Sequence, residues 1–405
     1  MGDLSDFDAA VNILKALIGL GMLNLPYATM KIGSLPAFLG MALVAVMTVY
    51  GIFYAVMAKE KFDKVKHQLP QTEQARLSGV DAAAEKNAFG KLDVGLGFFD
   101  EVVHEVFGWA GQALYDFSIL MCQVGTAISY VSVIAESSER FFGVPSKRRF
   151  EVLLIIGIVL SLLSCVKTLR GIAVLSLCGL LTYLFVFAAL IWESTEKVRD
   201  GTFASSAVMI QTSKPNYCMW FGIVAFAFGA FPIAITVYED MQMPRHFFRV
   251  CSLSFGMCFV FYTSFAMLGY LCYGVDTEDI IYFNFNKGSF FYSGSLLSIC
   301  TVLLFTYVLQ MVPAWKFAQS CVGETVPYML VRTVSVAVTV VVAYLVPSTA
   351  VLVEVTGSFA AAVASLSLPP LVYLNMEPRP AWSEYPMAVS LVVFGCFGAA
   401  SVFMT

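Results

Sequence analysis

Two glycine-containing segments interrupt apolar runs that are each long enough to form a membrane-spanning helix. The first is GLGMLNLPYATMKIG, residues 19–33, with three glycines and Pro26. The second is AFAFGAFPIAI, in which Gly229 and Pro232 break the run. Backbone groups in lipid must be hydrogen-bonded within the protein, so unwound backbone is tolerated only where it lines a protected cavity. Glycine and proline are also common as packing or kink residues in membrane helices, and this alternative stays open for either segment alone.

An unwound helix offers opposite partial charges at its two free ends. Exposed N–H groups at the N-terminus of a half-helix attract an anion such as a carboxylate, and unwound carbonyl groups accept hydrogen bonds from an ammonium group. An α-amino acid carries both groups on one carbon, and glycines allow its backbone end to approach closely. The two segments therefore predict a binding site for a zwitterion, and transport of amino acids is the hypothesis that follows.

The composition indicates an integral membrane protein. Of the 405 residues, 59% are hydrophobic and 13% are charged, with a mean hydropathy of +0.79, which does not fit a soluble domain with a polar surface. The net charge of −4 and the lack of a sustained basic run argue against a nucleic-acid partner. An enzyme would need a nucleophile with a base, or a convergent carboxylate or metal-ligand set. No such motif is visible in the sequence, so we expect no catalytic residues, no metal site and no cofactor.

Apolar runs between polar breaks predict about eleven membrane-spanning helices in a single domain over residues 1–405. The expected helices lie at about 9–31, 34–58, 112–138, 150–166, 171–192, 217–240, 249–273, 294–315, 328–346, 350–374 and 383–404. The fold class is therefore an all-α polytopic membrane protein. With the N-terminus inside, roughly 14 Lys and Arg residues lie in cytoplasmic segments and 8 outside. The positive-inside rule thus predicts a cytoplasmic N-terminus.

The long segment at about 59–111 is expected to be a cytoplasmic loop. Within it, the apolar residues recur at i, i+3, i+4, i+7 and i+8, and acidic residues occupy the other face. The apolar residues are Phe99, Val102, Val103, Val106 and Phe107. This spacing predicts a short amphipathic helix, and its acidic polar face favours docking on the helical bundle over binding to anionic lipid.

Interruptions in the first and sixth expected helices indicate two repeats of five helices with opposite orientation. Repeat 1 covers about 9–192, repeat 2 covers about 217–374, and an extra helix lies at about 383–404. Corresponding broken helices are the best sequence pointer to a binding site near the middle of the membrane in inverted-repeat transporters, which alternate access by rocking one bundle against the other.

Five segments carry a resemblance to a known family. They are NILKALIGLGMLNLPYA, VKTLRGIAVLSL, WFGIVAFAFGAFPIAITVYEDMQMP, TYVLQMVPAW and LVEVTGSFAAAVASLSLPPLVYL. Together they resemble the amino acid/auxin permease family, and especially its proton-coupled amino acid transporter branch. The resemblance extends from residue 12 to residue 374. It implies a leucine-transporter-type fold of eleven helices, with a 5+5 inverted repeat plus one extra helix, and secondary active transport of amino acids.

The resemblance also implies a substrate site. The residues that match the family's unwound segments are Gly19, Leu20, Gly21, Phe228, Gly229 and Ala230. The chain departs from the family pattern at Gly229-Ala230, where many proton-coupled members have Glu-Gly, and at Thr236, where proline is common. We expect a small neutral amino acid as substrate and a Gly21→Val variant that loses uptake at near-normal stability. The competing hypothesis is an amino-acid sensor that keeps the fold without transporting.

Lys15 lies one helical turn before Gly19 and on the same face. The resemblance implies that sodium-coupled relatives use an asparagine at this position to build a sodium site between the first and eighth helices. A lysine ammonium would repel a sodium ion there, so we expect coupling to protons, with Lys15 as the ion-coupling residue. In the alternative interpretation, Lys15 extends to the cytoplasmic interface. We expect a monomer in the plasma membrane or an endolysosomal or vacuolar membrane.

Overall fold

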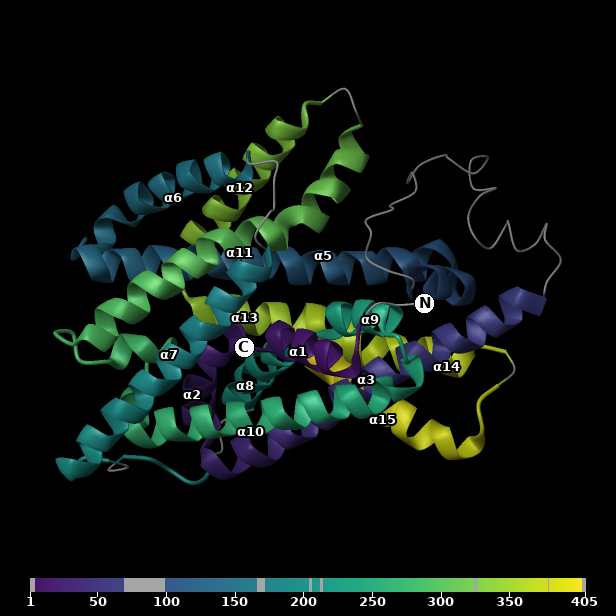
Figure 1. Ribbon diagram of the computed structural model, residues 1–405, viewed down its shortest axis with the longest axis horizontal. Coiled ribbons are helices and arrows are strands. Elements are labelled where there is room, and N and C mark those ends of the chain that lie inside the picture. Colours follow the sequence, from purple (N-terminus) through teal and green to yellow (C-terminus); the bar gives the residue numbers. More distant parts are fainter. Residues whose placement is uncertain are drawn as a thin grey trace.

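A computed structural model of the chain describes residues 4–68, 99–165, 172–203, 206–211, 214–323, 326–377 and 379–402. Apart from one β-bridge between Leu4 and Met241, the regular structure in these residues is helical. The main helices are α1 (Asp6–Leu17), α2 (Leu20–Ile32), α3 (Ser34–Gln68), α5 (Phe99–Phe142), α6 (Arg149–Ser164), α7 (Ile172–Arg199), α8 (Lys214–Ala227), α9 (Phe231–Asp240), α10 (Phe247–Tyr273), α11 (Phe290–Val322), α12 (Tyr328–Leu345), α13 (Thr349–Val355), the π-helix η6 (Thr356–Ser367), α14 (Leu368–Asn375) and α15 (Tyr385–Ser401). In Figure 1, α1, α8 and α13 occupy the middle of the bundle.

The described helices match the expected membrane spans closely. Nine helices in the described ranges are long and apolar enough to cross a membrane, and the count is ten if α1 and α2 form one bent span. The remaining expected span is α6, whose 16 residues extend only about 24 Å, somewhat less than a usual span. Its exposed Leu154, Ile155 and Leu162 are nevertheless apolar. The all-α polytopic architecture is thereby confirmed.

The amphipathic helix predicted in the long loop is present and docked. Phe99, Val102 and Val103 are fully buried, whereas Glu101 is exposed on the other face. This helix is not separate from the third span, because α5 includes both, and Gly108 marks a kink between them with φ 64°. A positive φ of this size favours glycine. Residues 69–98 of the loop lie outside the described residues.

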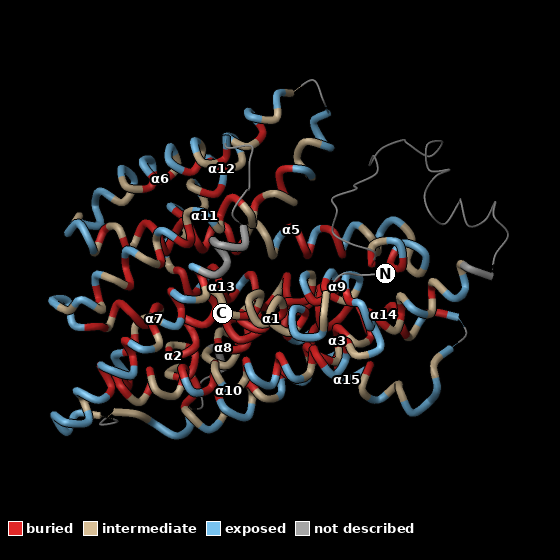
Figure 2. The backbone as a smooth tube through the Cα atoms, in the orientation of Figure 1, coloured by how far each residue is buried: buried red, intermediate tan, exposed pale blue. Residues whose placement is uncertain are grey.

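α8 and η6 cross at very close range. A Cβ atom on Gly357 would overlap the carbonyl oxygen of Gly222, and a Cβ atom on Gly222 would overlap Glu354 and Ser358. Only glycine at both positions allows the two helices to approach this closely. Figure 2 shows the buried residues concentrated around α1, α8 and α13. The sequence pattern did not predict the π-helix, a form that often occurs at functional sites.

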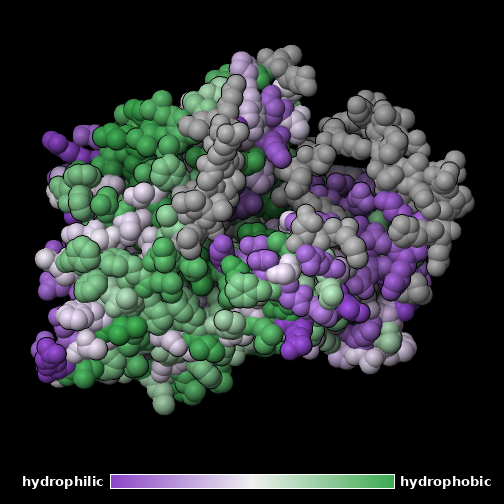
Figure 3. Space-filling view, in the orientation of Figure 1, coloured by the Kyte–Doolittle hydropathy of each residue, from purple (hydrophilic) through white to green (hydrophobic). Residues whose placement is uncertain are grey.

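The surface fits a protein embedded in a membrane. Large hydrophobic side chains are exposed on most of the long helices, for example Leu253 and Met257 of α10. Figure 3 shows hydrophobic residues over the left and middle of the molecule and hydrophilic residues gathered at the right, where Figure 1 places the N-terminus, α9 and α14. Apolar area of this extent belongs in lipid. The chain is an integral multi-pass membrane protein.

Candidate functional site

The first span breaks between Leu17 and Leu20. Ile18 leaves the helical conformation with ψ 98°, and Gly19 is extended, with φ −153° and ψ −160°. The axes of α1 and α2 are bent by 56° at this point. Gly19 is the N-cap of α2 and supplies no side-chain acceptor, so the N–H groups of the first turn of α2 lack the usual capping partner. The break thus places the carbonyl end of α1 beside the N–H groups at the start of α2.

The second break separates α8 from α9. The connecting residues Phe228–Ala230 form a tight turn, in which the N–H of Gly229 donates to the carbonyl of Phe226 at 3.0 Å and the N–H of Ala230 donates to the carbonyl of Phe228 at 2.8 Å. Pro232 lies in the first turn of α9, where its missing N–H has little cost. Both interruptions predicted from glycine and proline are therefore confirmed as helix breaks.

The two breaks lie against each other. A Cβ atom on Gly21 would lie 2.7 Å from the Cα of Ala227 and 3.0 Å from Cδ1 of Phe226. The N-terminus of α2, with its positive partial charge, therefore lies beside the C-terminus of α8, with its negative partial charge. This contact contradicts the expectation that Gly21→Val would keep near-normal stability, because a larger side chain must push α2 away from α8.

The predicted site residues differ in accessibility. Leu20, Gly21, Phe228 and Ala230 are buried, whereas Gly19 and Gly229 are partly accessible. A Cβ atom on Gly19 would meet only the carbonyl oxygen of Leu17, at 3.9 Å. A Cβ atom on Gly229 would instead lie 2.9 Å from the carbonyl oxygen of Phe226, so only the first break keeps a glycine next to open space.

Tyr262 of α10 contacts both breaks and was not predicted. Its hydroxyl donates a hydrogen bond to the carbonyl of Leu17, the last residue of α1, and lies 3.2 Å from the carbonyl of Ala227, the last residue of α8. The side chain is fully buried, and its ring packs edge-on against Phe228 at a centroid distance of 5.2 Å. In the sequence, a tyrosine within an apolar helix looks like a packing residue. The residues that accept from its hydroxyl are 245 and 35 positions away, so no local pattern indicates this role.

The far ends of the half-helices α1 and α9 are joined. The N–H of Leu4 donates to the carbonyl of Asp240 at 2.9 Å, and the N–H of Gln242 donates to the carbonyl of Leu4 at 3.0 Å. The side chains of Asp6 and His246 are 2.8 Å apart in an exposed hydrogen bond. These bonds tie the start of the first span to the end of the sixth, so the two broken spans are linked at one end as well as at their breaks.

Lys15 lies in the last turn of α1 and is partly exposed. None of the ion pairs between described residues includes it. A cation in this position interacts favourably with the carbonyl end of α1.

A charged network lies at the other end of α10. Arg140 of α5 contacts Glu136 at 2.9 Å and Glu278 at 2.5 Å. One carboxylate oxygen each of Glu136, Glu278 and Asp279 lie within 4.8 Å of one another, and the buried Asn24 donates to the backbone carbonyl of Asp279 at 2.6 Å. Burial raises the pKa of Asp279, and the Glu278 carboxylate raises it further. Because the Arg140 guanidinium pairs with two of the carboxylates, the group forms an ion-pair network that joins α2, α5 and the segment after α10.

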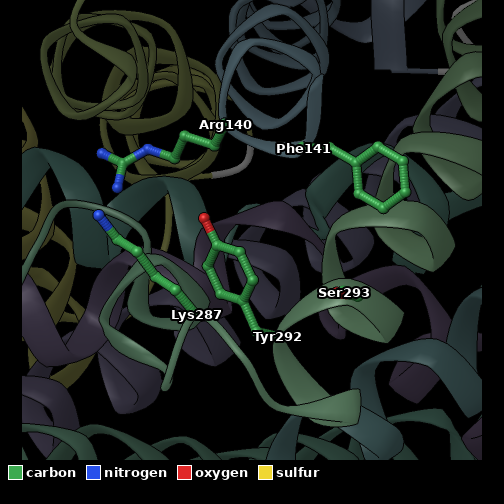
Figure 4. Close-up of a pocket in the computed structure, with 5 residues that line it drawn as sticks. All are labelled: Arg140, Phe141, Lys287, Tyr292 and Ser293. Atoms are coloured by element: carbon green, nitrogen blue, oxygen red, sulfur yellow. The ribbon is translucent and has the colours of Figure 1, made fainter. Parts of the chain in front are cut away.

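A cavity of about 400 Å³ opens beside this network. Its lining residues are Arg140, Phe141, Lys287, Tyr292 and Ser293. Figure 4 shows the charged ends of Arg140 and Lys287 close to the hydroxyl end of Tyr292, while Phe141 lies apart from them. None of these residues belongs to the helix breaks, so the cavity is separate from the predicted site.

Comparison with known proteins identifies relatives over the whole chain. The family model described as "Transmembrane amino acid transporter protein" matches residues 2–405. The chain is 25% identical to "Amino acid transporter AVT3C" of Arabidopsis thaliana over 421 aligned positions, which cover 98% of this chain and 89% of that protein. It is also 25% identical to "Amino acid transporter AVT3A" of the same plant over 382 positions, which cover 90% and 80%.

A solved structure supports the fold. The crystal structure of the Eremococcus coleocola manganese transporter in complex with an aromatic bis-isothiourea substituted compound has a TM-score of 0.51 to this chain at 14% identity. The match covers 98% of this chain and 87% of that one. At this identity the likeness concerns the fold alone, and it confirms the expected transporter fold with inverted repeats. The family resemblance seen in the sequence is likewise confirmed, and the relatives are transporters rather than enzymes.

Proposed function

The chain belongs to the family of transmembrane amino acid transporter proteins, and on that premise we propose that it is a secondary active transporter of small neutral amino acids. In this proposal the repeats at about 9–192 and 217–374 rock against each other to alternate access, and the helix at about 383–404 is additional. Transport is coupled to protons and independent of sodium. The Arabidopsis relatives are named as amino acid transporters, which supports the substrate class.

The contact between the two breaks is the observation that carries the proposal. Gly21 at the start of α2 lies against Ala227 at the end of α8. A substrate carboxylate at the free N–H groups of Gly19–Gly21 would then be close to carbonyl groups at the end of α8 and in Phe228–Ala230 that can accept from its ammonium group. The opposed partial charges match a zwitterion whose two charged groups are one carbon apart.

The side chains at the breaks favour a neutral and small substrate. Residues 17–21 and 226–231 contain no ionisable side chain. A charged substrate side chain would therefore be buried without a partner, at a high free-energy cost. Phe226 occupies the space beside Gly21, and the buried Phe228 adds a second aromatic ring at the other break, which disfavours a large substrate.

Proton coupling is proposed to use Lys15. Its ammonium group lies in the last turn of α1, one turn from Gly19, where a sodium ion would meet a fixed positive charge. A lysine whose surroundings alternate between water and protein during the cycle can release and regain a proton. In this proposal the N-terminus is cytoplasmic, the protein acts as a monomer, and the membrane is the plasma membrane or an endolysosomal or vacuolar membrane.

The test is uptake by purified protein in proteoliposomes. A thermal-shift screen against single amino acids first identifies the ligand, because a ligand that binds the folded state raises its stability. Uptake of that amino acid should be unchanged when choline replaces sodium and should rise with an inward proton gradient. Strict sodium dependence would contradict the proposed coupling. Saturable binding without accumulation or exchange would instead favour the sensor hypothesis.

A further inference from the structure

Two carbonyl groups, one from each break, converge on a single hydroxyl. They belong to Leu17 and Ala227, the last residues of α1 and α8, and both contact the Tyr262 hydroxyl. Each helix C-terminus carries a negative partial charge. In transporters with broken helices, carbonyl groups at such ends coordinate sodium ions or protons. Here a side chain of α10 takes the position between them.

We propose that the Tyr262 hydroxyl is a built-in donor that replaces a bound monovalent cation between the two breaks. It holds the ends of α1 and α8 together in the arrangement that binds substrate, so no sodium or potassium ion is needed at this point. This inference rests on the proposed function and adds a positioning residue to the same site. It is independent of Lys15, which lies on α1 itself.

The surroundings of Tyr262 fit a fixed donor. The side chain is fully buried, and the ring packs against Phe228, which stacks on Phe255 at 6.2 Å with an interplanar angle of 18°. The hydroxyl cannot leave the carbonyls without disturbing this cluster. It has one hydrogen to share between two acceptors, so it can stay bonded to Leu17 while Ala227 moves away. A neutral donor also avoids the cost of removing an ion from water.

The test compares Tyr262→Phe with Tyr270→Phe. Both substitutions remove one hydroxyl from a fully buried tyrosine of α10 and keep the ring. The Tyr270 hydroxyl also bonds to backbone, since it accepts from the N–H of Val208 at 2.7 Å and donates to its carbonyl at 3.2 Å. Val208 belongs to neither break. Tyr270→Phe therefore controls for the loss of a buried backbone hydrogen bond in the same helix.

Binding of the amino acid found in the screen is measured in choline, sodium, potassium and lithium chloride. The wild type and Tyr270→Phe should bind with the same Kd in all four salts. Tyr262→Phe should bind roughly tenfold more weakly in choline, because the binding-competent arrangement is less populated. A small cation, sodium or lithium, should restore much of this affinity by bridging the two orphaned carbonyls.

Each other outcome overturns the inference. Unchanged or tighter binding by Tyr262→Phe in choline would show that the hydroxyl is not needed or that it competes with the substrate. Weak binding that no cation restores would show that it does not stand in for an ion. A wild type that itself needs sodium would also refute it. Failure of the wild type to bind any amino acid would instead contradict the proposed function, so the two failures can be distinguished.

Discussion

Alanine at Gly21 and alanine at Gly19 should have different effects on stability, although each adds one methyl group at the same break. At Gly21 the new Cβ would lie 2.7 Å from the Cα of Ala227 and 3.0 Å from its Cβ. Carbon atoms in contact normally lie about 3.5–4.0 Å apart, so α2 and α8 must separate by roughly 1 Å. Overpacking of this kind lowers the free energy of unfolding by about 1–3 kcal/mol.

At Gly19 the same substitution meets open space. The nearest atom to the new Cβ is the carbonyl oxygen of Leu17, at 3.9 Å, and the extended backbone with φ −153° is accessible to alanine. The free energy of unfolding should therefore change by less than about 0.5 kcal/mol. If the substrate carboxylate lies at this break, however, the methyl group overlaps it. An overlap that weakens the binding free energy of the substrate by about 1–3 kcal/mol raises the apparent Kd roughly 5- to 150-fold.

Thermal unfolding in detergent and uptake in proteoliposomes separate these effects. Gly21→Ala should lower both stability and uptake, and Gly19→Ala should lower uptake alone. Gly256→Ala on α10 is the control, because a Cβ atom there meets nothing within 4 Å. Wild-type uptake by Gly19→Ala would refute the carboxylate site at the first break. Unchanged stability of Gly21→Ala would refute the close approach of α2 and α8.

Three further predictions concern other parts of the molecule. Gly357→Ala should lower the free energy of unfolding by about 3 kcal/mol or prevent expression, since the new Cβ atom would overlap the Gly222 carbonyl oxygen. A Gly357→Ala variant as stable as Gly256→Ala would contradict this prediction. Burial raises the pKa of Asp279 above its usual 3.8, so its contribution to folding stability should fall as pH rises from 3.8 through the raised pKa. Asp279→Asn should remove this pH dependence of stability and keep or raise the unfolding temperature at neutral pH. If the variant unfolds with the same pH profile as the wild type, the raised pKa of Asp279 is contradicted. Lys15→Met should flatten the response of uptake to a proton gradient, and a full response would assign the proton to another group.

Much of the fold could be predicted from the sequence because the signals are local. Hydropathy over about 20 residues located the membrane helices, and the glycine and proline pattern located both breaks. The spacing of Phe99, Val102 and Val103 predicted the amphipathic helix. Each of these features depends on residues within a few helical turns of each other, so no knowledge of the rest of the chain is needed.

The family resemblance had a different basis, since it used segments from residue 12 to residue 374. It located the candidate site residues by their match to a pattern, but it could not say which atoms they would contact. The expectation for the stability of Gly21→Val was wrong for this reason, because nothing near Gly21 in the sequence shows that Ala227 lies against it.

Tertiary structure alone decided the contacts between segments far apart in the chain. The position of the Tyr262 hydroxyl depends on how α10 packs against two other spans, and the crossing of Gly222 and Gly357 depends on the rotation of α8 and η6 about their axes. Tertiary structure also decided that η6 is a π-helix. The α and π forms of TGSFAAAVASLS differ by only one residue per hydrogen-bonded ring, so the sequence alone does not choose between them. Such small local differences in free energy are outweighed by close packing with neighbouring helices, and that packing exists only in the folded bundle.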